Sequence, residues 1–576
     1  MPLQFVDFAI IIAYLALMLG LGLAFSRRAG SSTQEFFLSG RSLPWWVAGT
    51  SMAATTFASD TPLVVTEIVR SEGIAGNWVW FNFAISHLVT TFFLAKLWHR
   101  SGVTTDVEFC EMRYSGRGAA ALRGAKGVFY AFITNVVVLG WVILAMTAIA
   151  GIFGVPKWMT LLICIALAST YASLAGLWGV VATDMLQFVV AMGGAVLLAF
   201  KVLGAEGGMA GLRERLPNLL DGAGRQAAEM APLTGFDWAS PAFRGAFMGF
   251  AVAVLVQWWS WKYSDGGGVL IQRMNAAKTE RDSRLGMLWF VIVTYAIRPW
   301  PWFLVALASL WVFPEMTDHK AVYPAMMAKY LGPGWLGLML AAMLAAFMST
   351  IDTHMNLASS YFVHDVYRRF WKKDASEKHY VRVARITGVV VVILGSMVAW
   401  LNNSISFLFV FLLQLVAGAG AVFLLRWFWW RINAWSEIAA MASSLIVATL
   451  LNLANKHDWL AYEFSTWEIF VWNVGISGAV WLTVAFVGPA TDSGKLRAFL
   501  TKTRAPGFWG VHGEGIDRES AGGVWINVLA GMALVYGLLF GIGFAFFGMG
   551  MPLVVAASAF IAGSALLIYR LRKSVS

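Results

Sequence analysis

The sequence has few charged residues, and this scarcity excludes most kinds of soluble protein. Asp, Glu, Lys and Arg together make up 13% of the 576 residues, whereas 59% of the residues are hydrophobic. A water-soluble globule of this length could not cover its surface with so little charge. The composition therefore predicts a protein that spans a lipid bilayer.

Several signatures of catalysis and covalent stabilisation are also missing. The two cysteines, Cys110 and Cys164, are expected on different elements, so no disulfide framework is predicted. The chain has no G-x-x-x-x-G-K-[ST] phosphate loop, no H-E-x-x-H zinc motif and no G-x-S-x-G nucleophile elbow. We therefore predict neither an enzyme nor a nucleotide-driven pump, and no bound cofactor.

Long apolar segments fill most of the chain. A membrane-spanning helix needs about 20 mostly apolar residues. This criterion predicts an all-α polytopic membrane protein with about 15 transmembrane helices, at 6–26, 45–70, 74–98, 127–153, 157–175, 179–203, 243–264, 285–313, 333–363, 381–401, 404–425, 434–454, 467–487, 522–548 and 551–569. The first segment has no basic residues before it and no small-residue cleavage site, so we expect it to be retained.

Basic residues are concentrated on one side of the membrane in this predicted topology. Short cytoplasmic loops carry excess Lys and Arg, and most of the 42 basic residues fall in alternate loops. This places the N-terminus outside and the C-terminus in the cytoplasm of a multi-pass protein of the cell (inner) membrane. The net charge of +11 is then a topology signal, and no nucleic-acid partner is predicted.

Ionisable residues inside the apolar segments are rare, and each is costly in a bilayer, so they mark sites or pathways by default. The predicted set is Asp60, Glu67, Asp184, Arg298, Asp352 and His354.

The segment 45–70 is interrupted by polar residues near its middle. Thr55, Thr56 and Ser59 to Thr61 come just before Pro62, which removes a backbone donor and disfavours helical geometry in the residue before it. A break there would turn carbonyl groups toward a cavity, since non-helical backbone at this depth needs one. The alternative is a kinked helix whose hydroxyls bond to carbonyls one turn back.

A stripe of oxygen atoms is predicted along one side of the segment 333–363. Ala346, Ser349 and Thr350 share a helix face, and Asp352 with Thr353 repeats the spacing. Carbonyl and hydroxyl oxygens suit a hard cation such as Na⁺. The alternative is contact between helices through small hydroxyl residues.

Arg298 is followed by Pro299 and Pro301 in the middle of an apolar segment. Its guanidinium needs a partner there. Either it pairs with a carboxylate, Asp60 or Glu67, or it lines a cavity and contacts a solute.

Several longer motifs follow one another along the chain. They run from S-L-P-W-W at Ser42 to F-W-W-R at Phe428, and between them lie Y-A-S-L-A-G-L-W-G-V-V-A-T-D-M-L-Q from Tyr171, I-Q-R-M-N-A-A-K from Ile271, and M-S-T-I-D followed by H-D-V-Y in the ninth segment. In this order the motifs resemble those of the solute:sodium symporter family, whose best known bacterial member carries galactose.

The resemblance implies a leucine-transporter-like fold of five plus five helices related by an inverted repeat, with one leading and four trailing helices. It divides the chain into a leading helix and inner loop at 1–41, a transport core at 42–430 and four additional helices at 431–576. The repeats would cover about 45–203 and 243–425, and an inner loop would lie at 488–522.

The resemblance also implies ion sites. The main Na⁺ site would use the carbonyls of Ala54, Phe57 and Ala346 and the hydroxyls of Ser349 and Thr350. Some members bind a second Na⁺, and the matching residues here are Asp184, Ser349, Asp352 and Thr353.

The solute site of the galactose carrier is matched only in part. Tyr263 aligns with its inner gate, and Gln414 matches a contact on the last core helix. At other contact positions this chain has Thr61, Trp80, Ser260 and Thr294, which argues against galactose. Asp60 and Arg298 complete the predicted solute or gate residues.

We therefore predict sodium-coupled symport of a small polar organic solute, with a sugar or sugar derivative favoured. The alternatives are an organic acid or other anion held by Arg298, coupling to protons through Asp184 or Asp352, a transporter-like sensor, and a membrane transferase using His354 and Asp352. The predicted partners are Na⁺, the solute and the lipid bilayer, and a monomer or weak oligomer is expected.

Overall fold

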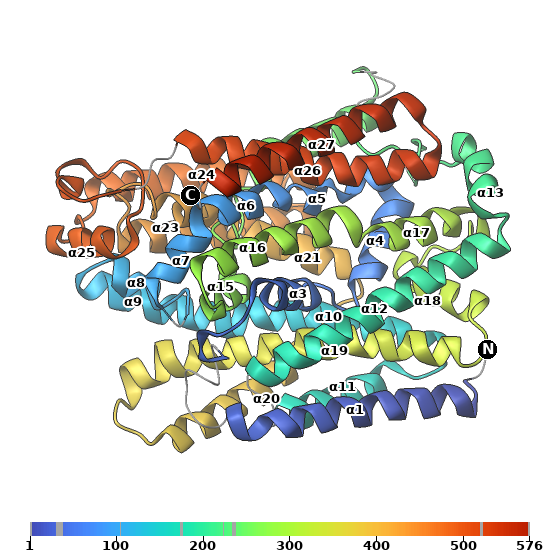
Figure 1. Ribbon diagram of the computed structural model, residues 1–576, viewed down its shortest axis with the longest axis horizontal. Coiled ribbons are helices and arrows are strands. Elements are labelled where there is room, and N and C mark those ends of the chain that lie inside the picture. The colour runs from blue at the N-terminus through green and yellow to red at the C-terminus, as the bar shows by residue number, and fades with distance from the viewer. Residues whose placement is uncertain are drawn as a thin grey trace.

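The computed structural model describes residues 3–29, 39–103, 105–172, 177–222, 224–232, 238–518 and 522–573. Within these ranges the chain is a bundle of helices without a β-strand (Figure 1). Most of the long helices run roughly along one direction, as expected for helices that cross a bilayer. Four residues of the motif that begins at Tyr171, residues 173–176, lie outside the described residues.

The first half of the bundle holds the leading helix and the helices of the first predicted repeat. They are α1 (Phe5–Ala29), α3 (Trp45–Thr55), α4 (Thr61–Glu72), α5 (Trp78–Phe81), α6 (Phe83–Val89), α7 (Ala95–Ser101), α8 (Phe109–Arg113), α9 (Gly116–Val128), α10 (Asn135–Ile152), α11 (Lys157–Ala172), α12 (Leu177–Ala205) and α13 (Gly208–Arg215). Short 3-10 or π-helical turns, η1 (Ser39–Arg41), η2 (Ile74–Asn77), η3 (Thr90–Leu94), η4 (Phe129–Thr134) and η5 (Leu216–Asn218), adjoin them.

The second half holds the other predicted repeat and the trailing helices. They are α14 (Pro241–Val252), α15 (Gly267–Ala276), α16 (Glu280–Val291), α17 (Trp300–Val312), α18 (His319–Tyr330), α19 (Trp335–Ser360), α20 (Glu377–Leu401), α21 (Ile405–Val416), α22 (Gly420–Leu425), α23 (Ala434–Lys456), α24 (Thr466–Val487), α25 (Ser493–Thr503), α26 (Gly522–Phe547) and α27 (Gly550–Lys573). Turns η6 (Ala253–Gln257), η7 (Ile292–Ile297), η8 (Tyr361–Trp371), η9 (Ala417–Ala419) and η10 (Gly510–Gly513) adjoin these helices.

The helical, membrane-spanning class predicted from composition is confirmed. Eleven helices in the described ranges are long and apolar enough to cross a membrane, and three shorter apolar helices accompany them. The count of about 15 crossings is not confirmed, partly because the segment 45–70 is divided into α3 and α4. The repeat and domain boundaries stay predictions.

The predicted segment 243–264 is helical only as far as Gln257. Beyond it the chain forms turns up to Gly266, where the backbone takes φ values of 118° at Gly266 and 68° at Gly267. Positive φ favours glycine and ends regular helical geometry. Interrupted helices therefore lie near the start of both predicted repeats.

The break between α3 and α4 satisfies its own backbone groups locally. The Phe57 amide donates to the Ala54 carbonyl at 2.9 Å, and the Ala58 amide donates to Thr61 Oγ1 at 3.2 Å. Pro62 stands in the first turn of α4, where its missing N–H costs nothing. The break predicted before Pro62 is thus present, with non-helical backbone at residues 56–60.

Helix α19 forms the centre of the bundle. Almost all of its residues from Leu336 to Ser360 are buried, and it packs against α3, α10, α12 and α20. The leading helix α1 covers α12 and α19, while α23 pairs with α24 and α26 pairs with α27 on the outside. The break between α3 and α4 therefore lies against a long helix that is almost entirely buried.

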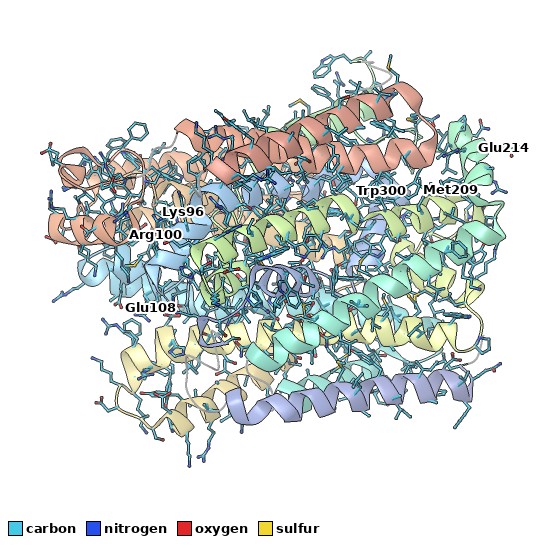
Figure 2. The ribbon with its side chains drawn as sticks, in the orientation of Figure 1. Lys96, Arg100, Glu108, Met209, Glu214 and Trp300 are labelled. Carbon is cyan, nitrogen blue, oxygen red and sulfur yellow. The ribbon has the colours of Figure 1, made fainter. Side chains whose placement is uncertain are left out.

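The two ends of the bundle differ in the elements they carry. In Figure 1 α8, α9 and α25 lie at the left, whereas α13 and the N-terminus lie at the right. Figure 2 places the side chains of Lys96, Arg100 and Glu108 toward the first end and that of Glu214 at the second.

A buried ion network closes the end that holds α8 and α9. Arg426 reaches Asp265 at 2.6 Å and Glu437 at 3.1 Å, and Lys126 reaches Glu437 at 2.6 Å. Close by, the Tyr361 hydroxyl donates to Asp106 at 2.6 Å, and burial raises the pKa of the Asp106 carboxyl. The network joins α9, the turn before α15, the end of α22 and α23.

We predict that Gly49→Ala destabilises the protein. A Cβ at Gly49 would overlap the Gly286 carbonyl oxygen and lie 2.9 Å from Trp289 Cδ1, where α3 crosses α16. Such overpacking costs about 1–3 kcal/mol, so the thermal unfolding temperature in detergent should fall. The control is Gly193→Ala on α12, where nothing lies within 4 Å of the added atom and the unfolding temperature should hold or rise. Equal effects of the two substitutions would contradict this packing.

Candidate functional site

The broken helix and α19 bring together the residues predicted for the main ion site. The Thr350 hydroxyl contacts the Thr55 carbonyl at 3.3 Å and the Ala346 carbonyl at 3.2 Å. Ala54, Phe57, Ala346, Ser349 and Thr350 are all buried. Two of them lie at the end of α3 and in the break and three lie on α19, and the bond from Thr350 to the Thr55 carbonyl joins these two parts.

Asp184 of α12 lies beside this junction and is fully buried. Its carboxylate accepts hydrogen bonds from Ser51 at 2.5 Å and Ser349 at 2.6 Å, with a longer contact from Thr55 at 3.4 Å. Three helices, α3, α12 and α19, therefore meet at one carboxylate. A bond from Ser349 links Asp184 directly to the main predicted ion site.

Arg273 of α15 is the cation next to Asp184. Its Nη2 atom lies 3.8 Å from Asp184 Oδ2 and donates to Thr55 Oγ1 at 3.2 Å and to Thr353 Oγ1 at 3.0 Å. Arg273 belongs to the I-Q-R-M-N-A-A-K motif and falls between the predicted segments 243–264 and 285–313, where a loop was expected. The sequence gives no sign that the motif folds back into the bundle.

The residues predicted for a second ion site lie around Asp184 and Arg273. Ser349 donates to Asp184, Thr353 accepts a bond from the Arg273 Nη2 atom that also faces Asp184, and the charge of Asp184 acts on Asp352. His354 does not join this group and bonds to Asn135 of α10 at 2.5 Å. Asp352 and His354 therefore do not form the acid–base pair that a transferase would need.

A cavity of about 220 Å³ lies in the middle of the bundle next to the break. Polar and aromatic side chains from both predicted repeats line it, among them Thr56, Asp60, Thr61, Trp80, His87, Trp261, Lys262, Tyr263, Thr294, Tyr295, Arg298, Thr350 and His354. Aromatic faces with a few convergent polar groups are typical of sites for small organic ligands.

Thr55 and Thr350 belong to both the cavity and the junction with α19. Both residues line the cavity, and the Thr350 hydroxyl bonds to the Thr55 carbonyl at 3.3 Å. The predicted ion site and the cavity are therefore in direct contact.

Arg298 lines this cavity and forms no ion pair with a described carboxylate. Its Nη1 atom donates to the Ala53 carbonyl at 2.8 Å and to Thr56 Oγ1 at 3.1 Å, and its Nε atom is buried without a hydrogen-bond partner. Glu67 instead accepts a bond from Ser406 at 2.7 Å. Of the two roles predicted for Arg298, the structure places it in the cavity wall.

Most of the predicted solute residues line the cavity, and two do not. Asp60, Thr61, Trp80, Tyr263 and Thr294 form part of the wall together with Arg298. Gln414 instead accepts a bond from Asn452 of α23 at 2.9 Å, and Ser260 is buried outside the lining.

Two features of the cavity were missed by sequence reasoning. His87 and Tyr295 bond to each other at 2.8 Å in its wall, and Lys262 reaches it from the turn after η6. Lys262 falls near the inner end of the predicted segment 243–264 and was not among the predicted solute residues. Its position directly after the aromatic run W-W-S-W was the available signal.

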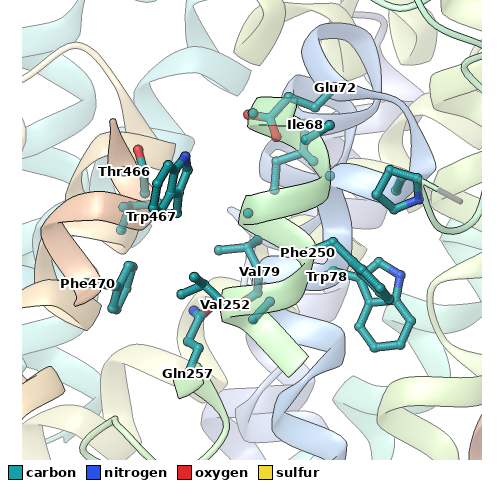
Figure 3. A pocket seen from close by; sticks show the side chains of 18 of the residues that line it. Ile68, Glu72, Trp78, Val79, Phe250, Val252, Gln257, Thr466, Trp467 and Phe470 are labelled. Atoms are coloured by element: carbon teal, nitrogen blue, oxygen red, sulfur yellow. Dashed lines mark hydrogen bonds between the residues drawn. The ribbon is translucent and has the colours of Figure 1, made fainter. Parts of the chain in front are cut away.

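A second cavity of about 360 Å³ adjoins the first. Figure 3 shows Trp78 and Val79 on one side, Phe250 and Val252 on α14, and Thr466, Trp467 and Phe470 on α24. Phe409 lines both cavities, so this space leads toward the central one. Its wall includes Glu72 and Arg225, from the side of the bundle near α13.

A bundle of membrane-spanning helices with a break at an enclosed polar site defines a multi-pass membrane transporter. The family model described as the sodium:solute symporter family matches residues 36–446. The chain belongs to this family.

Relatives within the family are cotransporters. The chain is 25% identical to a sodium/glucose cotransporter of Vibrio parahaemolyticus, over 78% of this chain and 85% of that protein. It is also 25% identical to a sodium/sialic acid symporter of Proteus mirabilis, over 80% of this chain and 92% of that one.

A solved structure of a Na⁺-coupled sialic acid symporter in a substrate-bound, outward-open state has the same fold. The TM-score is 0.68 at 22% identity, and the match covers 85% of this chain and 99% of that one.

We predict that Arg273 and Asp184 depend on each other for stability. Removing one partner of a buried charge pair leaves the other uncompensated and costs about 3–5 kcal/mol. Arg273→Gln and Asp184→Asn should therefore each lower the unfolding temperature in detergent strongly. The fall in unfolding temperature of the double variant should be much smaller than the sum of the two single falls. A strictly additive fall would contradict the coupling.

Proposed function

We propose that the protein is a secondary active transporter that couples Na⁺ entry to the uptake of a small polar organic solute, a sugar or sugar derivative. The observation that carries this proposal is the shared wall formed by Thr55 and Thr350. A cation held there would fix the break against α19 and so set the shape of the cavity.

The proposed Na⁺ ligands are the carbonyls of Ala54, Phe57 and Ala346 and the hydroxyls of Ser349 and Thr350. Two of these carbonyls accept bonds in the structure, Ala54 from the Phe57 amide and Ala346 from Thr350. A carbonyl oxygen has a second lone pair, so these bonds leave it able to face a cation.

A second Na⁺ at Asp184 is a further part of the proposal, and there it would share the carboxylate with Arg273. The match to the sodium:solute symporter family favours Na⁺ over H⁺ as the coupled ion. We expect the main site to dominate the Na⁺ dependence.

Transport would proceed by alternating access. With Na⁺ bound, the break and α19 are held together and the solute enters through the space next to Phe409. The chain then opens at the other end, where the Tyr263 side chain packs on Gly267 and Tyr361 bonds to Asp106. Each charge that moves down the membrane potential supplies about 2.3 kcal/mol per 100 mV.

The proposed setting is the cell (inner) membrane, with the N-terminus outside and the C-terminus in the cytoplasm. The two termini lie toward opposite ends of the bundle in Figure 1, which agrees with this arrangement. We propose a monomer or weak oligomer as the working unit.

The choice of a sugar or sugar derivative draws on the relatives and on the cavity wall. Transporters named for glucose and for sialic acid align along most of this chain. Aromatic faces such as Trp80 and Trp261, alternating with the hydroxyls of Thr56, Thr61 and Thr294, suit a hydroxylated ring.

We predict that Ser349→Ala/Thr350→Ala abolishes the response to Na⁺. The double change removes both hydroxyl ligands, so the rise in unfolding temperature when Na⁺ replaces choline at constant ionic strength should disappear. In proteoliposomes, uptake of labelled sugars and sugar acids driven by a Na⁺ gradient should fall to background.

The matched control is Ser443→Ala/Thr483→Ala, which removes hydroxyls that bond only within α23 and α24. This control should keep the wild-type Na⁺ response. An undiminished Na⁺ response in the α19 variant, or uptake driven by pH and indifferent to Na⁺, would exclude the proposed coupling.

A further inference from the structure

Lys262 carries an ammonium group that the protein itself does not satisfy. Its Nζ atom is buried without a hydrogen-bond partner, and the residue is only 6% exposed. The atom lies over the face of the Tyr263 ring, 4.4 Å from the ring centroid. A buried ammonium with no anion is costly, since its lost hydration is not replaced.

The acidic residues around Lys262 are engaged elsewhere. Asp106 acts on the charge of Lys262 but accepts the bond of Tyr361 at 2.6 Å. Asp265, three residues along the chain, pairs with Arg426 at 2.6 Å. Lys262 forms no ion pair within the described residues.

The same cavity wall contains a second cation, Arg298, which forms no ion pair within the described residues, although the charge of Asp60 acts on it. The Nη1 atom of Arg298 donates hydrogen bonds to the Ala53 carbonyl and to Thr56 Oγ1, and its Nε atom is buried without a hydrogen-bond partner. Asp60 is the single carboxylate among the described lining residues, beside two histidines, His87 and His354. With Lys262 and Arg298 positive, Asp60 negative and both histidines neutral, the side chains of the wall have a formal charge of +1.

We propose that the transported solute carries a carboxylate group and that Lys262 binds it, with Arg298 as the second cation of the site. This inference rests on the proposed function and narrows its solute class to small hydroxylated acids, such as sugar acids. Arrival of one carboxylate neutralises the excess charge of the wall and supplies the acceptor that the ammonium lacks.

The position of Lys262 also connects solute binding to the gate. Lys262 and Tyr263 are consecutive, and the ammonium rests on the Tyr263 ring, which in turn packs on Gly267. A carboxylate that draws the ammonium away from the ring removes a cation–π contact from the gate residue. Lys262 is thus a specificity-determining residue that touches both the solute and the gate.

The test compares acids with neutral sugars of the same ring. Calorimetry in Na⁺ buffer would measure Kd for glucuronate, galacturonate and N-acetylneuraminate, beside glucose and galactose. We expect at least one acid to bind and the neutral sugars to bind far more weakly. Lys262→Met should weaken acid binding by about 10-fold to 100-fold, and Lys262→Arg should restore part of it.

Two controls separate this inference from the proposed function. Lys157→Met removes a lysine that bonds to the Trp400 and Asn402 carbonyls, away from the cavity, and should leave acid binding unchanged. The Na⁺-dependent rise in unfolding temperature should persist in Lys262→Met, which shows that this variant folds and keeps its ion site. Loss of that rise in the wild type would instead reject Na⁺ coupling.

Three results would overturn the assignment. They are acid binding that Lys262→Met leaves unaltered, neutral sugars that bind as tightly as their acids, and no acid binding by a wild type that still responds to Na⁺.

Discussion

Backbone groups that leave a helix inside a bilayer must find other partners, because lipid offers none. The break between α3 and α4 is the place where this chain meets that constraint. Its amides and carbonyls are partly satisfied within the break, by Ala54 and Thr61, and partly from other helices. Arg298 donates to Ala53, and Thr350 donates to Thr55. These hydrogen bonds thus hold the surrounding helices next to the break.

Buried polar and charged side chains also need partners inside a bilayer, and this need explains why charged groups lie together around α3 and α19. Asp184 orients the hydroxyls of Ser51 and Ser349, and Arg273 balances its charge. Neither residue touches the central cavity, yet both fix the residues that do. In the proposed ion site, uncharged oxygen ligands lie close to a carboxylate whose charge Arg273 balances, and such a set suits a monovalent cation.

The end of the bundle that holds α8 and α9 is closed by a different kind of interaction. Arg426, Glu437, Asp265 and Lys126 form short buried ion pairs that join the predicted core to the trailing helix α23. Buried pairs of this kind contribute little net stability compared with apolar packing, but they require one specific arrangement. We propose that they stabilise one of two conformations, while Na⁺ acts at the break near α19.

By itself the sequence determined the bilayer as solvent, the helical class, the break before Pro62 and the oxygen stripe on α19, since these follow from local composition and spacing. It also led to the family, through motifs that keep their order along the chain. Only the tertiary structure decided which polar groups meet. It turned Gln414 toward Asn452, set Arg273 beside Asp184, and placed Lys262 in the wall of the cavity. Contacts between residues far apart in the chain depend on how whole helices pack and where they break, and no local pattern encodes them.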